Sequence, residues 1–158
     1  EEDKQVTQLL LELQREVNNP DLYIITPFKK VAENLRKTIQ NDTDISKRWL
    51  TGLGGDDKQR LLADDWKHIN SWVHNRIATI HTMQGREAEA IILVLGAQGS
   101  VKAREWASKE PNLLNVAVTR AKEAIYVIGN KDLWKKAGEK EKLFEKLYDI
   151  IEGDNFYN

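Results

Sequence analysis

Four short runs of mostly apolar residues constrain the fold of this chain more than any other feature. They cover residues 22–25, 77–80, 90–95 and 124–128. A run that is apolar at nearly every position suits a strand covered on both faces, as in parallel sheets. Longer segments separate these runs, and strands that alternate with helices predict an α/β domain with helices on both faces of the sheet.

Five other segments carry apolar residues at helical spacing and are predicted to be helices. They are residues 6–17, 31–39, 61–73, 111–122 and 143–151. The third of them lies in a helical insertion at about 41–75, which also contains a glycine-rich connection. A chain of 158 residues is one ordinary domain, and because Met83 is its only methionine, we expect it to be a piece of a longer protein.

Charge and cysteine content exclude several classes of protein. With 24 basic and 25 acidic residues there is no bulk positive field, so nucleic acid could be bound only by a local patch. The absence of cysteine excludes a disulfide scaffold and a thiolate metal site, and it fits a reducing, cytoplasmic compartment. His68 and His74 are six residues apart, so we expect no metal site. No apolar run approaches the length of about 18 residues that would span a membrane.

Polar residues at 79–87 follow the second predicted strand, and ligands in such sheets bind beyond the carboxyl ends of strands. Thr79, His81 and Thr82 are neutral donors suited to phosphodiester oxygens. Gly85 would let backbone N–H groups approach a phosphate, and Glu87 could accept from a sugar hydroxyl. The alternative is a turn whose polar groups satisfy one another.

An arginine interrupts the apolar face of the helix predicted at 111–122. Arg120 falls inside the apolar arc, between Val116 and Leu113, and the arc also includes Val118. Such an arginine is buried, extends outward, or points into a cleft where a ligand neutralises it. A planar guanidinium suits a phosphate, whereas the alternative is a structural ion pair with a carboxylate.

The first predicted strand ends in Thr26, Pro27 and Phe28. The proline fixes a turn, the threonine offers a hydroxyl, and the phenylalanine either stacks on a base or belongs to the core. Among the five tryptophans, Trp66 lies at helical spacing with apolar neighbours, so core packing is favoured over base stacking. No G-x-x-x-x-G-K-[ST] phosphate-binding loop is present.

Taken together and in this order, residues 24–28, 79–87 and 114–122 resemble motifs IV, V and VI of superfamily 1 helicases. The resemblance is to the second, C-terminal RecA-like motor domain, in the branch of the nonsense-mediated-decay helicase and its DNA-acting relatives. It covers roughly 20–40 and 76–135, and Phe28 stands where a tyrosine is usual. It implies a RecA-like sheet of the P-loop NTPase class, in a single domain over 1–158 that lacks its own P-loop.

The resemblance implies a nucleotide site with three members. Arg120 matches the arginine finger that reaches the γ-phosphate, Gly85 matches the glycine whose N–H faces that phosphate, and Glu87 matches the acid near the ribose. ATP and Mg²⁺ would be bound mainly by an N-terminal RecA-like lobe, which this sequence does not contain. We therefore expect the isolated chain not to hydrolyse ATP.

The resemblance also implies a track for single-stranded nucleic acid. Thr79, His81 and Thr82 match positions that face its backbone, and Thr26 and Pro27 match a segment near the strand. The lead into the third motif, residues 110–114, resembles bacterial-type relatives and favours DNA over RNA.

Three other interpretations remain open at this stage. The chain could be a degenerate lobe that serves as a non-catalytic nucleic-acid- or protein-binding module. It could belong to an NTP-driven switch without unwinding activity. It could also be an α/β domain whose motifs are accidental. Upstream sequence with a phosphate-binding loop would separate the helicase from the degenerate lobe.

Overall fold

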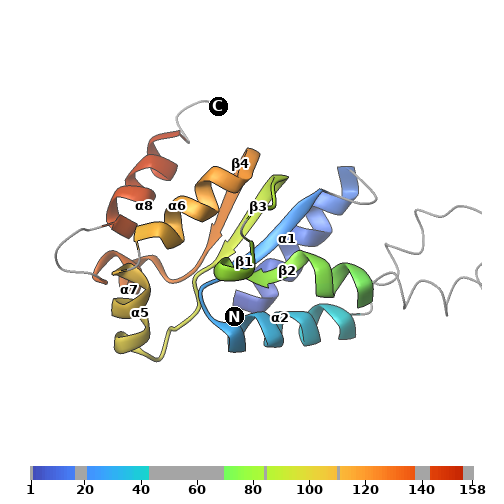
Figure 1. The fold of residues 1–158 in the computed structure, drawn as a ribbon, viewed down its shortest axis with the longest axis horizontal. Coiled ribbons are helices and arrows are strands. Elements are labelled where there is room, and N and C mark those ends of the chain that lie inside the picture. Colours follow the sequence, from blue (N-terminus) through green and yellow to red (C-terminus); the bar gives the residue numbers. More distant parts are fainter. Residues whose placement is uncertain are drawn as a thin grey trace, which may run out of the picture.

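The computed structural model describes residues 2–16, 21–42, 70–83, 85–109, 111–137 and 143–154. Its centre is a parallel sheet of four strands in the order β2-β1-β3-β4 (Figure 1). The strands are β1 (Leu22–Thr26), β2 (Ile77–Thr79), β3 (Ala88–Val94) and β4 (Ala121–Ile128). The four predicted strands and the α/β fold class are confirmed, and the architecture is that of a RecA-like sheet.

Helices cover both faces of this sheet (Figure 1). One face packs against α1 (Glu2–Glu16), α2 (Lys29–Asn41) and helical residues 70–76. The other packs against α5 (Val101–Ser108), α6 (Pro111–Arg120), α7 (Lys131–Lys135) and α8 (Leu143–Asp154).

The central strand shows why its sequence is apolar throughout. All five residues of β1 are buried, and successive side chains enter opposite cores. Leu22 and Ile24 pack with α1 and α2, whereas Tyr23 and Ile25 pack on the side of α6 and α8.

Several predicted boundaries were wrong. The predicted helix 111–122 ends at Arg120, and β4 begins at the next residue because Ala121 already pairs with Ala88 of β3. Two short helices, α5 and α7, were not predicted. Ile80 leaves β2 and begins the 3₁₀ helix η1 (Ile80–Met83). Most of the predicted insertion at 41–75, including Trp66, lies outside the described residues, although 70–76 are helical.

The core beside α7 and α8 is built on one aromatic pair. Trp134 is fully buried, and its ring centroid lies 4.6 Å from that of Phe144. The indole Nε1 donates to the Gly96 carbonyl oxygen at 3.1 Å, in the loop between β3 and α5. Trp134 therefore fixes α7 and α8 to the end of β3.

Within the described residues, β2 is the edge strand on one side of the sheet, and it has only three residues. Arg36 of α2 donates to the Ile77 carbonyl oxygen, through Nε at 3.1 Å and Nη2 at 2.5 Å. On the other side, β4 begins with Ala121, followed by the exposed Lys122 and Glu123. Among the described helices, none combines the length and apolarity needed to span a bilayer.

Glu2 gives a first testable prediction about stability. Burial raises the pKa of this carboxyl, although hydrogen bonds to the Gln98 side chain and the Gly96 backbone oppose the rise. One carboxylate oxygen, Oε1, is buried without a hydrogen-bond partner. Because the pKa is higher in the folded chain than in the unfolded chain, ionisation at neutral pH costs stability. We expect Glu2→Gln to raise the melting temperature at pH 7.

The sign of the effect fixes its pH dependence. Below the unfolded pKa, near pH 4, both states are protonated and the substitution should change little. As pH rises through the folded pKa, the native chain loses stability that Glu2→Gln retains. Thermal unfolding at both pH values measures the difference, with Glu12→Gln as a control on an exposed carboxylate of the same helix. An equal effect of Glu2→Gln at both pH values would contradict the prediction.

Candidate functional site

The site residues predicted from the sequence lie at the two opposite ends of the parallel strands. We call these the carboxyl edge and the amino edge of the sheet. Five of them are at or beyond the carboxyl ends of β1 and β2: Thr26, Pro27, Thr79, His81 and Thr82. The other three are near the amino ends of β3 and β4: Gly85, Glu87 and Arg120.

The sequence analysis looked for ligand-binding residues beyond the carboxyl ends of strands, whereas Glu87 and Arg120 directly precede β3 and β4. Connections between parallel strands must return the chain to the amino edge, so a residue just before a strand lies there. Glu87 directly precedes β3, and Arg120 is the last residue of α6, directly before β4. The pairing of Ala88 with Ala121 brings these two positions together.

Arg120 is a partly buried cation whose N–H groups remain available for hydrogen bonds. Its Nε is buried and has no partner. Within the described residues, the guanidinium forms no hydrogen bond or ion pair with any other group. The structural ion pair that the sequence left open thus finds no support in this part of the chain. An unpaired guanidinium at a partly open position is suited to receive an anion.

The helix that carries Arg120 explains its position. Leu113, Leu114 and Ala117 of α6 are buried, so the end of the helix is held against the sheet. On the opposite side, the Thr119 hydroxyl donates to the Asn115 carbonyl oxygen at 2.8 Å.

The predicted apolar arc of α6 is too wide. Val118, which was placed in that arc, is 46% exposed. The helix is ten residues long and packs against one face of the sheet. It therefore buries a narrower stripe of side chains than its apolar composition suggests.

Glu87 and Gly85 precede β3, and both are exposed. The Glu87 carboxylate is 3.8 Å from Lys122 Nζ, and both side chains are more than half exposed, so this ion pair adds little stability. Gly85 has a φ of +79°, and a Cβ at this position would have nothing within 4 Å. The turn therefore requires glycine for its backbone conformation, while the space around it stays open for a ligand.

At the opposite edge, Thr26 and Pro27 shape the backbone. Both are buried, and the Thr26 hydroxyl accepts a hydrogen bond from the Phe28 N–H at 3.4 Å. The hydroxyl that the sequence offered to a ligand is thus buried and already accepts one hydrogen bond within the chain. Its effect is to fix the turn that presents Phe28.

Residues of β2 and η1 expose polar groups beside that turn. The Thr82 hydroxyl donates to the Thr79 carbonyl oxygen at 2.8 Å, and the two hydroxyl oxygens are 3.4 Å apart. The alternative of a self-satisfied turn therefore holds in part for the threonines. His81 is exposed and forms no hydrogen bond within the described residues. No group of three His, Asp or Glu side chains that could hold a metal ion occurs in the described ranges.

Comparison with known proteins shows the family of this chain. Residues 1–132, which include all eight predicted site residues, match the model of a family described as AAA domain. The chain belongs to this AAA domain family. A segment of 80 residues, 46% of the chain, is 32% identical to the DNA polymerase alpha-associated DNA helicase A of Saccharomyces cerevisiae. The match covers 12% of that relative's length.

Sequence reasoning missed one residue at the carboxyl edge of this AAA domain. Trp106 of α5 is 44% exposed, with its ring centroid 6.1 Å from that of Phe28 and 6.5 Å from that of His81. The assignment of the tryptophans to the core hid it, as did the absence of a predicted helix at 101–108. Ser100 was the available signal, because its side chain caps α5 by accepting from the Ala103 N–H at 3.2 Å.

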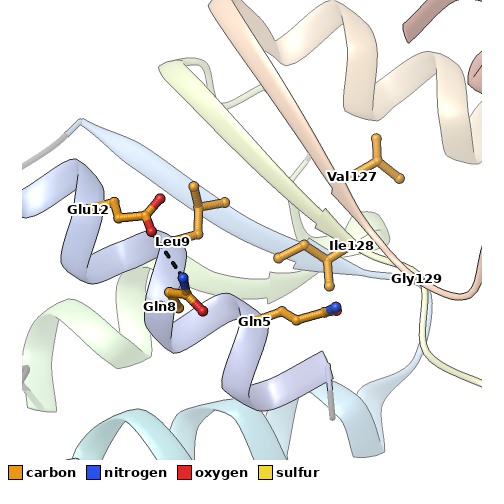
Figure 2. A pocket seen from close by; sticks show the side chains of 7 residues that line it. All are labelled: Gln5, Gln8, Leu9, Glu12, Val127, Ile128 and Gly129. Carbon is orange, nitrogen blue, oxygen red and sulfur yellow. Dashed lines mark hydrogen bonds between the residues drawn. The ribbon is translucent and has the colours of Figure 1, made fainter. Parts of the chain in front are cut away.

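The AAA domain also has a pocket at the carboxyl end of β4, with a volume of about 320 Å³ (Figure 2). It is lined by Gln5, Gln8, Leu9, Glu12, Val127, Ile128 and Gly129. Gln8 and Glu12 hydrogen-bond to each other at 3.2 Å, as Figure 2 shows. None of the eight predicted residues contributes to this pocket, so it is separate from the candidate site.

Proposed function

We propose that this AAA domain is the C-terminal motor lobe of an ATP-dependent DNA helicase or translocase of superfamily 1. The observation that carries the proposal is Arg120, whose buried Nε lacks a partner at the edge that also presents Glu87 and Gly85. Similarity to part of a yeast DNA helicase supports it. The branch of the nonsense-mediated-decay helicase and its DNA-acting relatives is part of the proposal.

The amino edge of the sheet would serve the nucleotide. Arg120 would donate to the γ-phosphate and stabilise the charge that develops as the phosphoryl group is transferred. The N–H of Gly85 would face the same phosphate from a turn that leaves space for it. The exposed Glu87 carboxylate would accept from the ribose hydroxyls. An N-terminal RecA-like lobe would hold ATP and Mg²⁺, and the metal would neutralise phosphate charge there.

The carboxyl edge would serve the backbone of single-stranded nucleic acid, DNA in preference to RNA. His81 and Thr82 are exposed there, and their N–H and O–H donors suit phosphodiester oxygens without selecting a base. Thr26 and Pro27 would act by holding the turn that precedes α2. This division predicts binding with weak sequence preference and strong salt dependence.

A single segment would link the two edges. Between the carboxyl end of β2 and the amino end of β3, the structure describes residues 80–83, which form η1, and residues 85–87. When the cleft closes on ATP, movement of Gly85 would be passed along this segment to Thr82 and His81. A segment that contacts both ligands is a natural element for coupling hydrolysis to translocation.

The proposal predicts different activities for one lobe and for two. The isolated chain should not hydrolyse ATP above background, because the phosphate-binding loop and the metal site belong to the other lobe. A longer protein with both lobes should hydrolyse ATP, and single-stranded DNA should stimulate it. Steady-state hydrolysis of both proteins, with and without DNA, tests this. Turnover by the isolated chain at a helicase-like rate would refute the assignment, and an inactive two-lobe protein would indicate a non-catalytic binding module.

A further inference from the structure

Three aromatic rings from three separate segments meet at the carboxyl edge of the sheet. Phe28 follows β1, His81 lies in η1 after β2, and Trp106 lies in α5 after β3. The Trp106 ring centroid is 6.1 Å from that of Phe28, at an interplanar angle of 46°, and 6.5 Å from that of His81, at 53°. We call these three residues the aromatic platform.

The centre of the platform is open. Trp106 leaves 44% of its surface exposed, and His81 is also exposed, whereas Phe28 is half-buried against the core. An apolar ring held open in this way has contact area to offer to a flat partner.

The helix that carries Trp106 is anchored, so the ring is held in place. Arg104 is buried, and its Nη1 donates to the carbonyl oxygens of Ala97 and Gln98 at 2.6 and 2.8 Å. On the next positions after Trp106, the side chains of Ala107 and Ser108 are buried. A ring that is ordered before binding loses little conformational entropy when it is bound.

The surroundings of the platform suit a polyanion. Exposed lysines neighbour it in the sequence: Lys29 and Lys30 directly follow Phe28, and Lys102 and Lys109 lie within four residues of Trp106 on the chain. Glu105 is the one acidic residue in residues 28–30 and 101–109. Stacking rings together with a local excess of cations are the features by which proteins hold single-stranded nucleic acid without reading its sequence.

We propose that the aromatic platform binds an unpaired base of a single-stranded nucleic acid, with Trp106 as the stacking surface. Thr79 and Thr82 lie beside His81 and would hold the adjoining phosphates. This inference rests on the proposed function, since it assigns a base subsite to the strand that the carboxyl edge would carry. It adds a contact to bases, where the proposed function requires only backbone contacts.

Fluorescence anisotropy on the whole chain tests the platform with two labelled probes. One is an oligothymidylate of about 20 nucleotides, and the other is an abasic oligomer of the same length and charge. Trp106→Ala should weaken binding of the first probe by about 5- to 150-fold and leave the second nearly unchanged. Trp106→Phe should retain most of the affinity, because it keeps an aromatic face. Val101→Ala is the matched control, since Val101 is 61% exposed on the same helix.

The outcomes separate this inference from the proposed function. If the native chain binds both probes equally and Trp106→Ala changes neither, the platform does not bind bases, while the backbone track of the proposed function stands. If Trp106→Ala weakens both probes alike, the tryptophan acts through the structure of the edge and the inference is wrong. If the native chain binds neither probe at low salt, the nucleic-acid track and the platform are both refuted. Circular dichroism of each variant checks that the fold is retained.

Discussion

Replacing Arg120 with alanine should lower DNA-stimulated ATP hydrolysis by the two-lobe protein by about 10³-fold or more. The guanidinium is the group at the amino edge whose buried Nε lacks a partner, so its removal creates no orphaned partner within the described residues. The loss should therefore fall on the chemical step. A fluorescent ATP analogue should bind with nearly native affinity, and single-turnover hydrolysis should show the full defect.

Two further variants make this test specific. Arg120→Lys keeps the charge but loses the planar fork that binds two phosphate oxygens, so it should recover little activity. Lys122→Ala removes an exposed cation at the same edge and should leave hydrolysis within a small factor of the native rate. Normal hydrolysis by Arg120→Ala would make the arginine structural and favour a non-catalytic binding module.

Replacing Trp134 with alanine should destabilise the chain by about 3–5 kcal/mol, a large part of the total stability of a domain this size. The side chain is fully buried, its ring packs on Phe144, and its loss also leaves the Gly96 carbonyl oxygen without a donor. Urea unfolding of the isolated chain measures the change. Trp134→Phe should give an intermediate loss, since it keeps much of the packing but not the hydrogen bond.

The same substitution at Trp106 is the natural control. Trp106 is 44% exposed, so Trp106→Ala should cost less than about 1 kcal/mol. Equal losses of unfolding free energy at the two positions would mean that Trp106 also stabilises the fold. In that case, the effect of Trp106 on binding would need the phenylalanine variant for its interpretation.

The sheet was predictable because the apolar composition of its strands reflects their burial. Every residue of β1 is buried, and its sequence is correspondingly apolar without alternation. The helix boundary at Arg120 was not predictable in the same way, because the pairing of Ala121 with Ala88 is made across a long stretch of sequence. The short helix α7 depends on a carbonyl oxygen that is distant in sequence, that of Gly96, which accepts from Trp134. The short helix α5 is anchored locally, by Arg104 on the carbonyl oxygens of the loop before it.

The candidate site was predictable in residue type but not in arrangement. Local sequence marked Arg120 as unusual because a charge interrupts an apolar face, and the structure gives that charge no partner in the described residues. Thr79 ends β2 whereas Glu87 directly precedes β3, and the positions of these strand ends depend on sheet pairing that no local pattern indicates. Trp106 was missed because its neighbours, Phe28 and His81, come from other segments.

The way the sheet ends has a consequence for self-association. An open strand edge is a template on which a second chain can add, and that addition leads toward aggregates. Here, β2 offers only three residues, and one of its carbonyl oxygens already accepts from Arg36. At the far side, β4 carries the exposed Lys122 and Glu123 directly after its first residue, and their charges would have to lose water beside an incoming strand. Both margins therefore disfavour growth of the sheet from one molecule to the next.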